Sequence, residues 1–225
     1  MRVRSAILAT DGLTLRNGEL LSDSGKLQLR GNRVRMEDVS TQALVEVQGA
    51  HGVVLQNCNM SNAKVDGGAT GVLFRDCNFS KSLNSLVVSG AGTAVTATNT
   101  HITSAHSTGF RVDQGASLHL VDCSARLIGN RYNLCRDTTY PHTHCIYGYG
   151  RSLKIGEGSR LEASHCTFEC LQNAKAFALH AGSSAKGELT ECTLLGDVHL
   201  DALAEVQMLD CTYGPKKTWT VGMPL

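Results

Sequence analysis

A pattern of apolar and polar positions recurs along the chain, and a cysteine marks each copy. Apolar residues lie five and three positions before the cysteine, a polar residue lies directly before it, and a large apolar residue lies two positions after it in most copies. Apolar residues at every second position predict β-strands with one buried side. The clearest copies are Val53–Met60, Val72–Phe79, Leu118–Ala125, Leu161–Phe168 and Val206–Tyr213.

The spacing of these copies predicts a solenoid. Thr100 and Val39 occupy the cysteine position in two further copies, and neighbouring copies are 19 to 26 residues apart, except for an interval of 43 between Cys123 and Cys166. A second strand is expected roughly a dozen residues before each copy, with a Gly-containing turn between the two strands in most coils. The apolar pairs that predict this second strand include Val45/Val47, Phe110/Val112, Leu153/Ile155, Phe177/Leu179 and Val198/Leu200.

A single coil cannot bury its inward side chains, but coils stacked about 4.8 Å apart pair every strand in parallel and form a continuous core. A leucine-rich repeat would need leucines where several coils have Val or Ala, and a left-handed helix would need a hexapeptide period, which is absent. We therefore predict an all-β, single-stranded right-handed parallel β-helix of about eight coils, forming one domain over residues 1–225. Residues 1–24 are expected to form an N-terminal cap or first coil, 126–151 a loop insertion, and 214–225 a C-terminal cap.

The repeat explains most of the nine cysteines without disulfides. An odd number of cysteines excludes complete pairing within the chain. When the coils stack, the repeated cysteine positions form a column, and we expect these side chains to be small, polarizable core residues where each coil bends. The polar residues before the cysteines, such as Asn57, Asp76 and Asp122, are expected to hydrogen-bond turn amides rather than to bind a ligand.

Composition narrows the function classes only a little. The formal net charge is +1, from 21 basic and 20 acidic residues, which argues against a general polyanion binder and hence against nucleic acid. No apolar stretch is long enough to span a membrane, and the apolar run at 5–10 is too short for a signal peptide. A cytoplasmic protein is the expectation.

The coils over residues ~25–221 resemble those of the pectin-lyase-like superfamily, and in particular carbohydrate-binding and sugar-hydrolase repeats. That resemblance implies the β-helix fold. It leaves the activity open, because the superfamily includes lyases, hydrolases, epimerases and non-enzymatic interaction domains. The aspartate of the epimerase-type Asp-Pro-His motif is replaced here by Tyr140.

The insertion at 126–151 is the main candidate for function, because an insertion in a solenoid forms a loop on one face. Its mixture of aromatic, arginine and histidine side chains is typical of a recognition surface. The candidate binding residues are Arg131, Tyr132, Arg136, Asp137, Tyr140, His142, His144, Tyr147, Tyr149 and Arg151. Alternatively, the residues around Cys145 form an irregular coil of the solenoid and are not part of a binding loop.

Neither a metal nor a cofactor is predicted, since the spacing of Cys135, His142, His144 and Cys145 is not that of a standard zinc site. Two functions remain open. The first is a non-enzymatic scaffold that presents the insertion to a protein or glycan partner, either alone or as a subunit of a larger assembly. The alternative is a polysaccharide lyase acting on a polyuronate, with loop arginines and Asp122 or Asp137.

Overall fold

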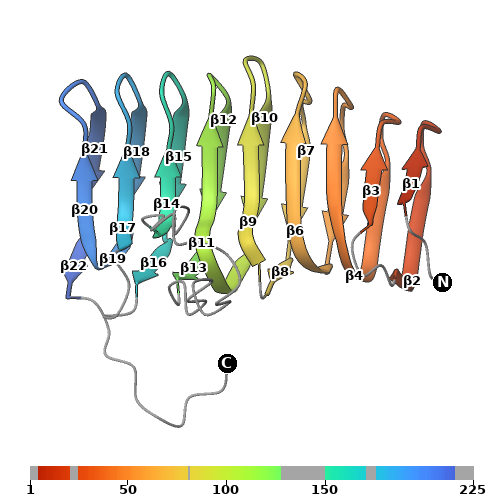
Figure 1. Ribbon diagram of the computed structural model, residues 1–225, viewed down its shortest axis with the longest axis horizontal. Helices are drawn as coiled ribbons and strands as arrows, with labels where there is room; N and C mark the ends of the chain where they lie inside the picture. Colours follow the sequence, from red (N-terminus) through yellow and green to blue (C-terminus); the bar gives the residue numbers. More distant parts are fainter. Residues whose placement is uncertain (1–4, 21–24, 81, 128–149, 171–175, 216–225) are drawn as a thin grey trace, which may run out of the picture.

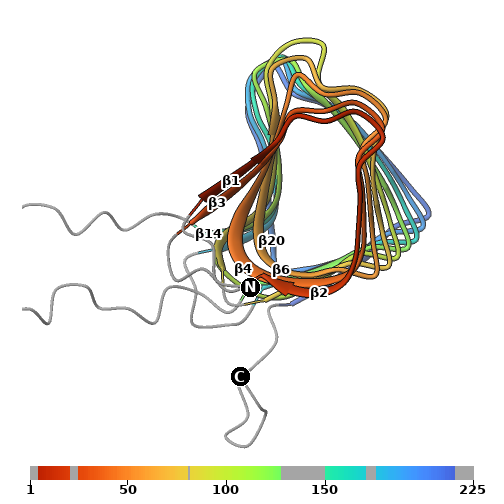
Figure 2. The ribbon, with the colours of Figure 1, turned by 90° about the vertical axis from the view of Figure 1, so that its right-hand side faces the viewer.

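The computed structural model describes residues 5–20, 25–80, 82–127, 150–170 and 176–215. These residues form a right-handed parallel β-helix, as the sequence and the superfamily resemblance predict. Successive coils lie side by side in Figure 1, and the view along the stack in Figure 2 shows a roughly triangular cross-section with three faces. Among the described residues, no helix is long and apolar enough to cross a membrane.

Each described coil contributes one strand segment to each face, and every pairing between neighbouring coils is parallel. The first face contains β1 (Ser5–Leu8), β3 (Lys26–Leu29), the end of β4 (Arg35–Gln48), the end of β6 (Asn59–Asp66), β9 (Ser82–Ser89), the end of β11 (His101–Asp113), β14 (Gly150–Ile155), β17 (Ala176–Ala181) and β20 (Asp197–Leu200).

The second face follows the turn after the first. It contains the start of β2 (Thr14–Leu20), the start of β4, β5 (Val54–Gln56), β7 (Val72–Arg75), β10 (Ala94–Thr98), β12 (Ser117–Val121), β15 (Arg160–Ser164), β18 (Lys186–Thr190) and β21 (Glu205–Leu209).

The third face closes the coil. It contains the end of β2, the middle of β4, the starts of β6 and β11, and β8 (Asn78–Phe79), β13 (Ser124–Leu127), β16 (Thr167–Cys170), β19 (Thr193–Leu195) and β22 (Thr212–Gly214). The described residues thus give nine strand segments on each face, close to the number of coils expected, with residues 5–20 forming a first coil.

The core is one continuous stack of apolar columns. The pairs Phe110/Val112 and Leu153/Ile155 are fully buried on the first face, as their alternation predicts. Phe110 also packs edge-on against Phe168 of the third face, with ring centroids 6.3 Å apart. Truncating a buried phenylalanine of this kind typically costs about 3–5 kcal/mol.

The cysteine column lies at the bend between the second and third faces, as expected. All seven described cysteines are free thiols, and those of the column are buried except for Cys211 at the end of the stack. Each thiol of the column donates to at least one backbone carbonyl; Cys77 Sγ, for example, lies 3.4 Å from the Leu55 oxygen and 3.3 Å from that of Arg75. Thr100 fills the same place with its hydroxyl, 3.1 Å from the Thr98 oxygen.

The polar residue before each cysteine has a conformational role. In nine consecutive coils this residue has φ between 46° and 57°, the left-handed region that Asn and Asp tolerate best. Two of the side chains bond across coils rather than to turn amides, which corrects the expected partner: Asn57 donates to Asp38, and Asn99 donates to Asp76 at 2.7 Å. The positive φ values give this column a role in shaping the bend, and its hydrogen-bond partners differ from those expected.

Candidate functional site

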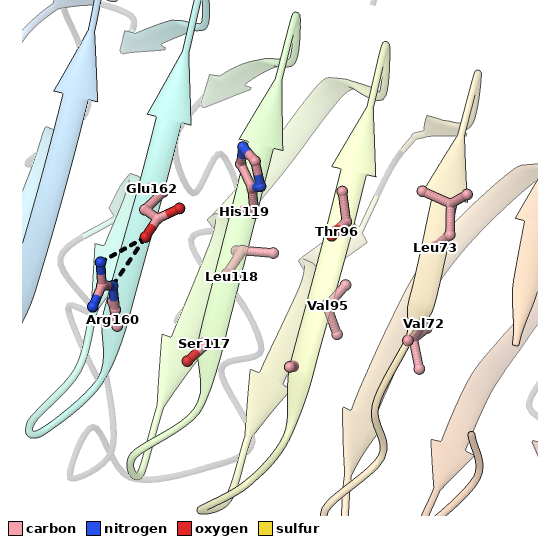
Figure 3. A pocket seen from close by; sticks show the side chains of 11 residues that line it. Val72, Leu73, Val95, Thr96, Ser117, Leu118, His119, Arg160 and Glu162 are labelled. Atoms are coloured by element: carbon pink, nitrogen blue, oxygen red, sulfur yellow. Dashed lines mark hydrogen bonds and ion pairs between the residues drawn. The ribbon is translucent and has the colours of Figure 1, made fainter. Parts of the chain in front are cut away.

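The structure has a shallow hollow on the first face and another on the second face. The second-face hollow is the larger, at about 490 Å³, and lies over β7, β10, β12 and β15. Figure 3 shows Leu73, Thr96 and His119 projecting outward from neighbouring strands, with Glu162 on the next strand.

The charged groups of the second-face hollow neutralise each other. Arg160 contacts Glu162 through Nε at 3.0 Å and through a terminal nitrogen at 2.7 Å, and the side chains are 64% and 44% exposed. An ion pair in water contributes little, about 0–1 kcal/mol. Most of the remaining lining is apolar, so this hollow offers a ligand few polar groups.

The hollow of the first face, about 410 Å³, is lined by polar groups of several chemical types. Amide side chains come from Asn62, Asn84 and Gln114, and charged groups from Lys64, Arg111 and Asp113. The Asn62 side-chain oxygen is buried and, within the described ranges, has no hydrogen-bond partner. Such an unpaired buried amide oxygen is uncommon in folded proteins.

A row of cationic and imidazole side chains continues from this hollow toward the C-terminal end of the first face. In the strand register, Arg111 is opposite Lys154, Lys154 is opposite His180, and His180 is opposite His199. Arg111 and Lys154 point outward because their neighbours in sequence on both sides are the buried core pairs. The parallel register places the four side chains about 4.8 Å apart, rung by rung.

The carboxylate of Asp113 contacts the first two cations of this row, Arg111 and Lys154. It is 6% exposed, accepts a hydrogen bond from Arg111 Nε, and lies 3.4 Å from Lys154 Nζ. Gly156, on the next rung, leaves space for this carboxylate, because a Cβ there would collide with Asp113 Oδ1. Arg111, Asp113 and Lys154 therefore form one ion-paired group, and the group requires glycine at position 156.

The cationic groups of the row disfavour further positive charge. Partial burial, followed by the charge of Arg111, lowers the pKa of Lys154. The same two causes, in the same order, lower the pKa of Arg151. Burial and then Arg151 lower the pKa of His180. An anion bound here would relieve this repulsion, so the arrangement is suited to binding a negatively charged group.

The far end of the row is an aromatic and histidine cluster. The His180 and His199 rings are stacked, with centroids 5.1 Å apart and planes 4° from parallel. Phe177 contacts both, at 5.9 Å and 5.4 Å. Asp201, after β20, lies 3.0 Å from His199 Nε2. These three polar groups are the candidate metal ligands among the described residues.

The sequence-predicted site overlaps this face at one residue. Arg151 lies on β14 of the first face, half-buried beside the row. Asp122, proposed for the lyase alternative, occupies the exposed bend between β12 and β13 and is therefore not on the first face. The other candidates lie outside the described residues: Arg131, Tyr132, Arg136, Asp137, Tyr140, His142, His144, Tyr147 and Tyr149.

One sequence expectation on this face is wrong. Phe177 was paired with Leu179 as an inward residue, but it is half-buried on the outside against the two histidines. The cause is a register shift between Phe177 and Leu179, which makes Ala178, Leu179 and Ala181 the buried residues of β17. A bulge reverses the side-chain direction on one side of it.

The sequence analysis missed most residues of this face, among them Arg111, Asp113, Lys154, His180, His199 and Asp201. The sequence did indicate the direction of some of these side chains. Arg111, Lys154 and His199 each lie between two apolar residues assigned to the core, so they are expected to point outward from a strand.

Comparison with known proteins adds little to this geometry. No protein family profile matches the chain, and no curated protein sequence matches it. Among solved structures, it is similar to that of the pectate lyase Pel9A, with 8% identical residues and a TM-score of 0.45, over 96% of this chain and 67% of that one. The functional argument therefore depends on the residues of this chain.

Proposed function

We propose that the chain is a non-enzymatic β-helix module that binds an acidic glycan along its first face. The observation that carries the proposal is the continuous row from the amide-lined hollow through Arg111 and Lys154, with Arg151 beside it. Cationic side chains bind carboxylates, and amides bind sugar hydroxyls. A sugar chain with carboxylates needs both kinds of group side by side.

The strand geometry suits an extended ligand. Side chains at equivalent positions repeat about every 4.8 Å on a rigid sheet, so a chain lying across the rungs meets successive contacts without reordering the protein. The lowered pKa of Lys154, caused first by burial, fits a site whose cations gain from a bound carboxylate.

The 126–151 insertion belongs to the same proposal. Its last residue, Arg151, is on the first face, and β14 begins at Gly150. The other insertion candidates, such as Arg131, Tyr140 and His142, lie outside the described residues, and their part in binding stays a prediction.

The test is calorimetric titration of the purified chain with an oligogalacturonate and with a neutral oligosaccharide of equal length. We expect binding of the acidic sugar alone, weakening as salt is added. Lys154→Ala should weaken it roughly tenfold, since a charge-assisted hydrogen bond contributes about 1.5–3 kcal/mol.

Arg160→Ala is the matched control, because it removes a cation from the second-face hollow. Circular dichroism checks that both variants are folded. Equal losses in both variants, or equal binding of the neutral sugar, would overturn the proposal.

A second candidate is a lyase on the same ligand class, and the position of Lys154 favours it. Its lowered pKa, from burial and then Arg111, increases the neutral fraction that can act as a base. Neutral Nζ would take the proton from the carbon beside the uronate carboxylate, and the electron pair would form a double bond as the bond to the glycosidic oxygen breaks. The leaving oxygen would take its proton from solvent water. Absorbance of unsaturated uronate products in a prolonged incubation distinguishes this activity from binding alone.

A further inference from the structure

The last two described rungs of the first face bring together two imidazoles and a carboxylate. His180 on β17 and His199 on β20 are register partners, and Asp201 follows two residues after His199. One ligand atom from each residue lies within 4.8 Å of the other two. The three residues are 21 positions apart at most in sequence, and the coil spacing is what joins them.

The backbone and a neighbouring ring hold these side chains in place. The Asp201 amide donates to the Ala181 oxygen at 2.9 Å, and the Ala204 amide donates to the Asp201 oxygen at 2.9 Å, which fixes the turn that carries the carboxylate. The Phe177 ring packs against both imidazoles, with ring centroids 5.9 Å and 5.4 Å from those of His180 and His199. Ligands on strands and tight turns are better positioned than ligands on long loops.

Hydrogen bonding leaves part of this cluster open. Within the described residues, His180 Nδ1 is buried and has no hydrogen-bond partner. This unpaired imidazole nitrogen belongs to one of the three residues whose ligand atoms lie together, so it is a candidate metal ligand.

We propose that His180, His199 and Asp201 bind a divalent transition metal ion of the zinc type. Two imidazole nitrogens and a carboxylate oxygen are a frequent ligand set for zinc, and they leave a fourth position for water or a ligand group.

Metal binding requires a side-chain rotation, because an ion lies in the plane of each imidazole that binds it and the two rings are now stacked with parallel planes. Zinc takes nitrogen and oxygen ligands at about 2.0–2.2 Å, so the three ligand atoms must come somewhat closer than their present 4.8 Å limit. The His199 and Asp201 side chains, 50% and 36% exposed, are able to turn inward, while the more enclosed His180 provides the fixed ligand.

The surrounding charges determine which ions bind. Arg151 and Lys154 lie on β14, which pairs directly with β17, and their positive charges oppose any cation at this position. An ion held mainly by charge, such as calcium, also prefers six or more oxygen ligands, which this cluster does not provide. A coordinate bond to imidazole tolerates the nearby positive charge better, so zinc, nickel and copper are selected over calcium and magnesium.

The experiment is calorimetric titration of the chelator-treated full chain with zinc chloride, followed by calcium chloride. We expect one zinc site abolished or weakened at least tenfold by His199→Ala and by Asp201→Asn, and no calcium binding. Cobalt provides a second readout, because tetrahedral cobalt with nitrogen ligands gives visible absorption bands that these substitutions should remove.

His165→Ala is the matched control, since His165 forms a similar histidine–carboxylate pair with Glu191 at 3.2 Å, on another side of the stack. It should leave zinc binding unchanged. The proposal is overturned if the parent chain binds no zinc, or if zinc binding survives in both site variants. The titration uses no glycan, so its outcome is independent of the function proposed above.

Discussion

The first and second faces are built by the same repeat, yet they carry different chemistry. Both have parallel strands, an inward apolar column and a shallow hollow. On the second face, the outward charges pair with each other in solvent, as Arg160 does with Glu162. On the first face, one nearly buried carboxylate, Asp113, serves two cations. The fold sets the spacing of side chains, and the partial burial of charge distinguishes the first face, where we propose binding.

The largest expected difference between the faces concerns their carboxylates. Asp113→Asn should lower the free energy of unfolding by about 2 kcal/mol, since it leaves two partly buried cations without a counter-charge; the usual 3–5 kcal/mol is reduced because both cations keep some solvent. Glu162→Gln on the second face should cost less than about 1 kcal/mol. Denaturant unfolding measures both, and equal costs would contradict the comparison.

A smaller effect is expected from the space that the carboxylate occupies. Gly156→Ala should destabilise the protein by about 1–2 kcal/mol, because the new methyl group displaces Asp113 from Arg111 and Lys154. Gly182, one rung further along, is the matched control: its Cβ would meet only ordinary contacts, the nearest at 3.5 Å. Thermal unfolding of the two alanine variants should separate them; the same melting temperature for both would show that the carboxylate has room to move.

The smallest effect is a pH dependence confined to the first face. The folded-state pKa of His180 is lowered from 6.5, by burial first and then by Arg151. The unfolded chain therefore binds more protons than the folded one just below pH 6.5, so stability is full above that pH and falls as the solution is acidified. In His180→Gln this acid-side slope should become shallower. His119→Gln, from the second-face hollow, is the comparison, and an identical slope in all three proteins would be evidence against the assignment.

The coil architecture was predictable because equivalent residues recur at regular intervals in the sequence. The cysteine column gave the bend, and the apolar pairs gave the core of the first face. The same intervals also contain the functional row. Arg111, Lys154, His180 and His199 are separated by 43, 26 and 19 residues, as are the column positions from Cys123 to Cys211. Applying the core repeat to the outward positions would have identified the row.

Other parts of the site were not available from the sequence. The bulge that turns Phe177 outward depends on how β17 pairs with its neighbours, and the alternation of apolar residues gave the opposite direction. The burial of Asp113 depends on the absence of a side chain at Gly156, 43 positions away. The net charge of +1 was also a poor guide, because it averages a locally cationic row with acidic residues elsewhere.

The strand ladder is continuous across the 126–151 insertion. β11 pairs directly with β14, and β13 pairs directly with β16, although 22 residues lie between β13 and β14 in the chain. The length of that segment therefore does not enter the register of the solenoid, and lengthening such a connection costs little, roughly 0.6 kcal/mol for each doubling. The corner where the third face meets the first can therefore accept chain segments of different length, while the cationic row next to it keeps its geometry.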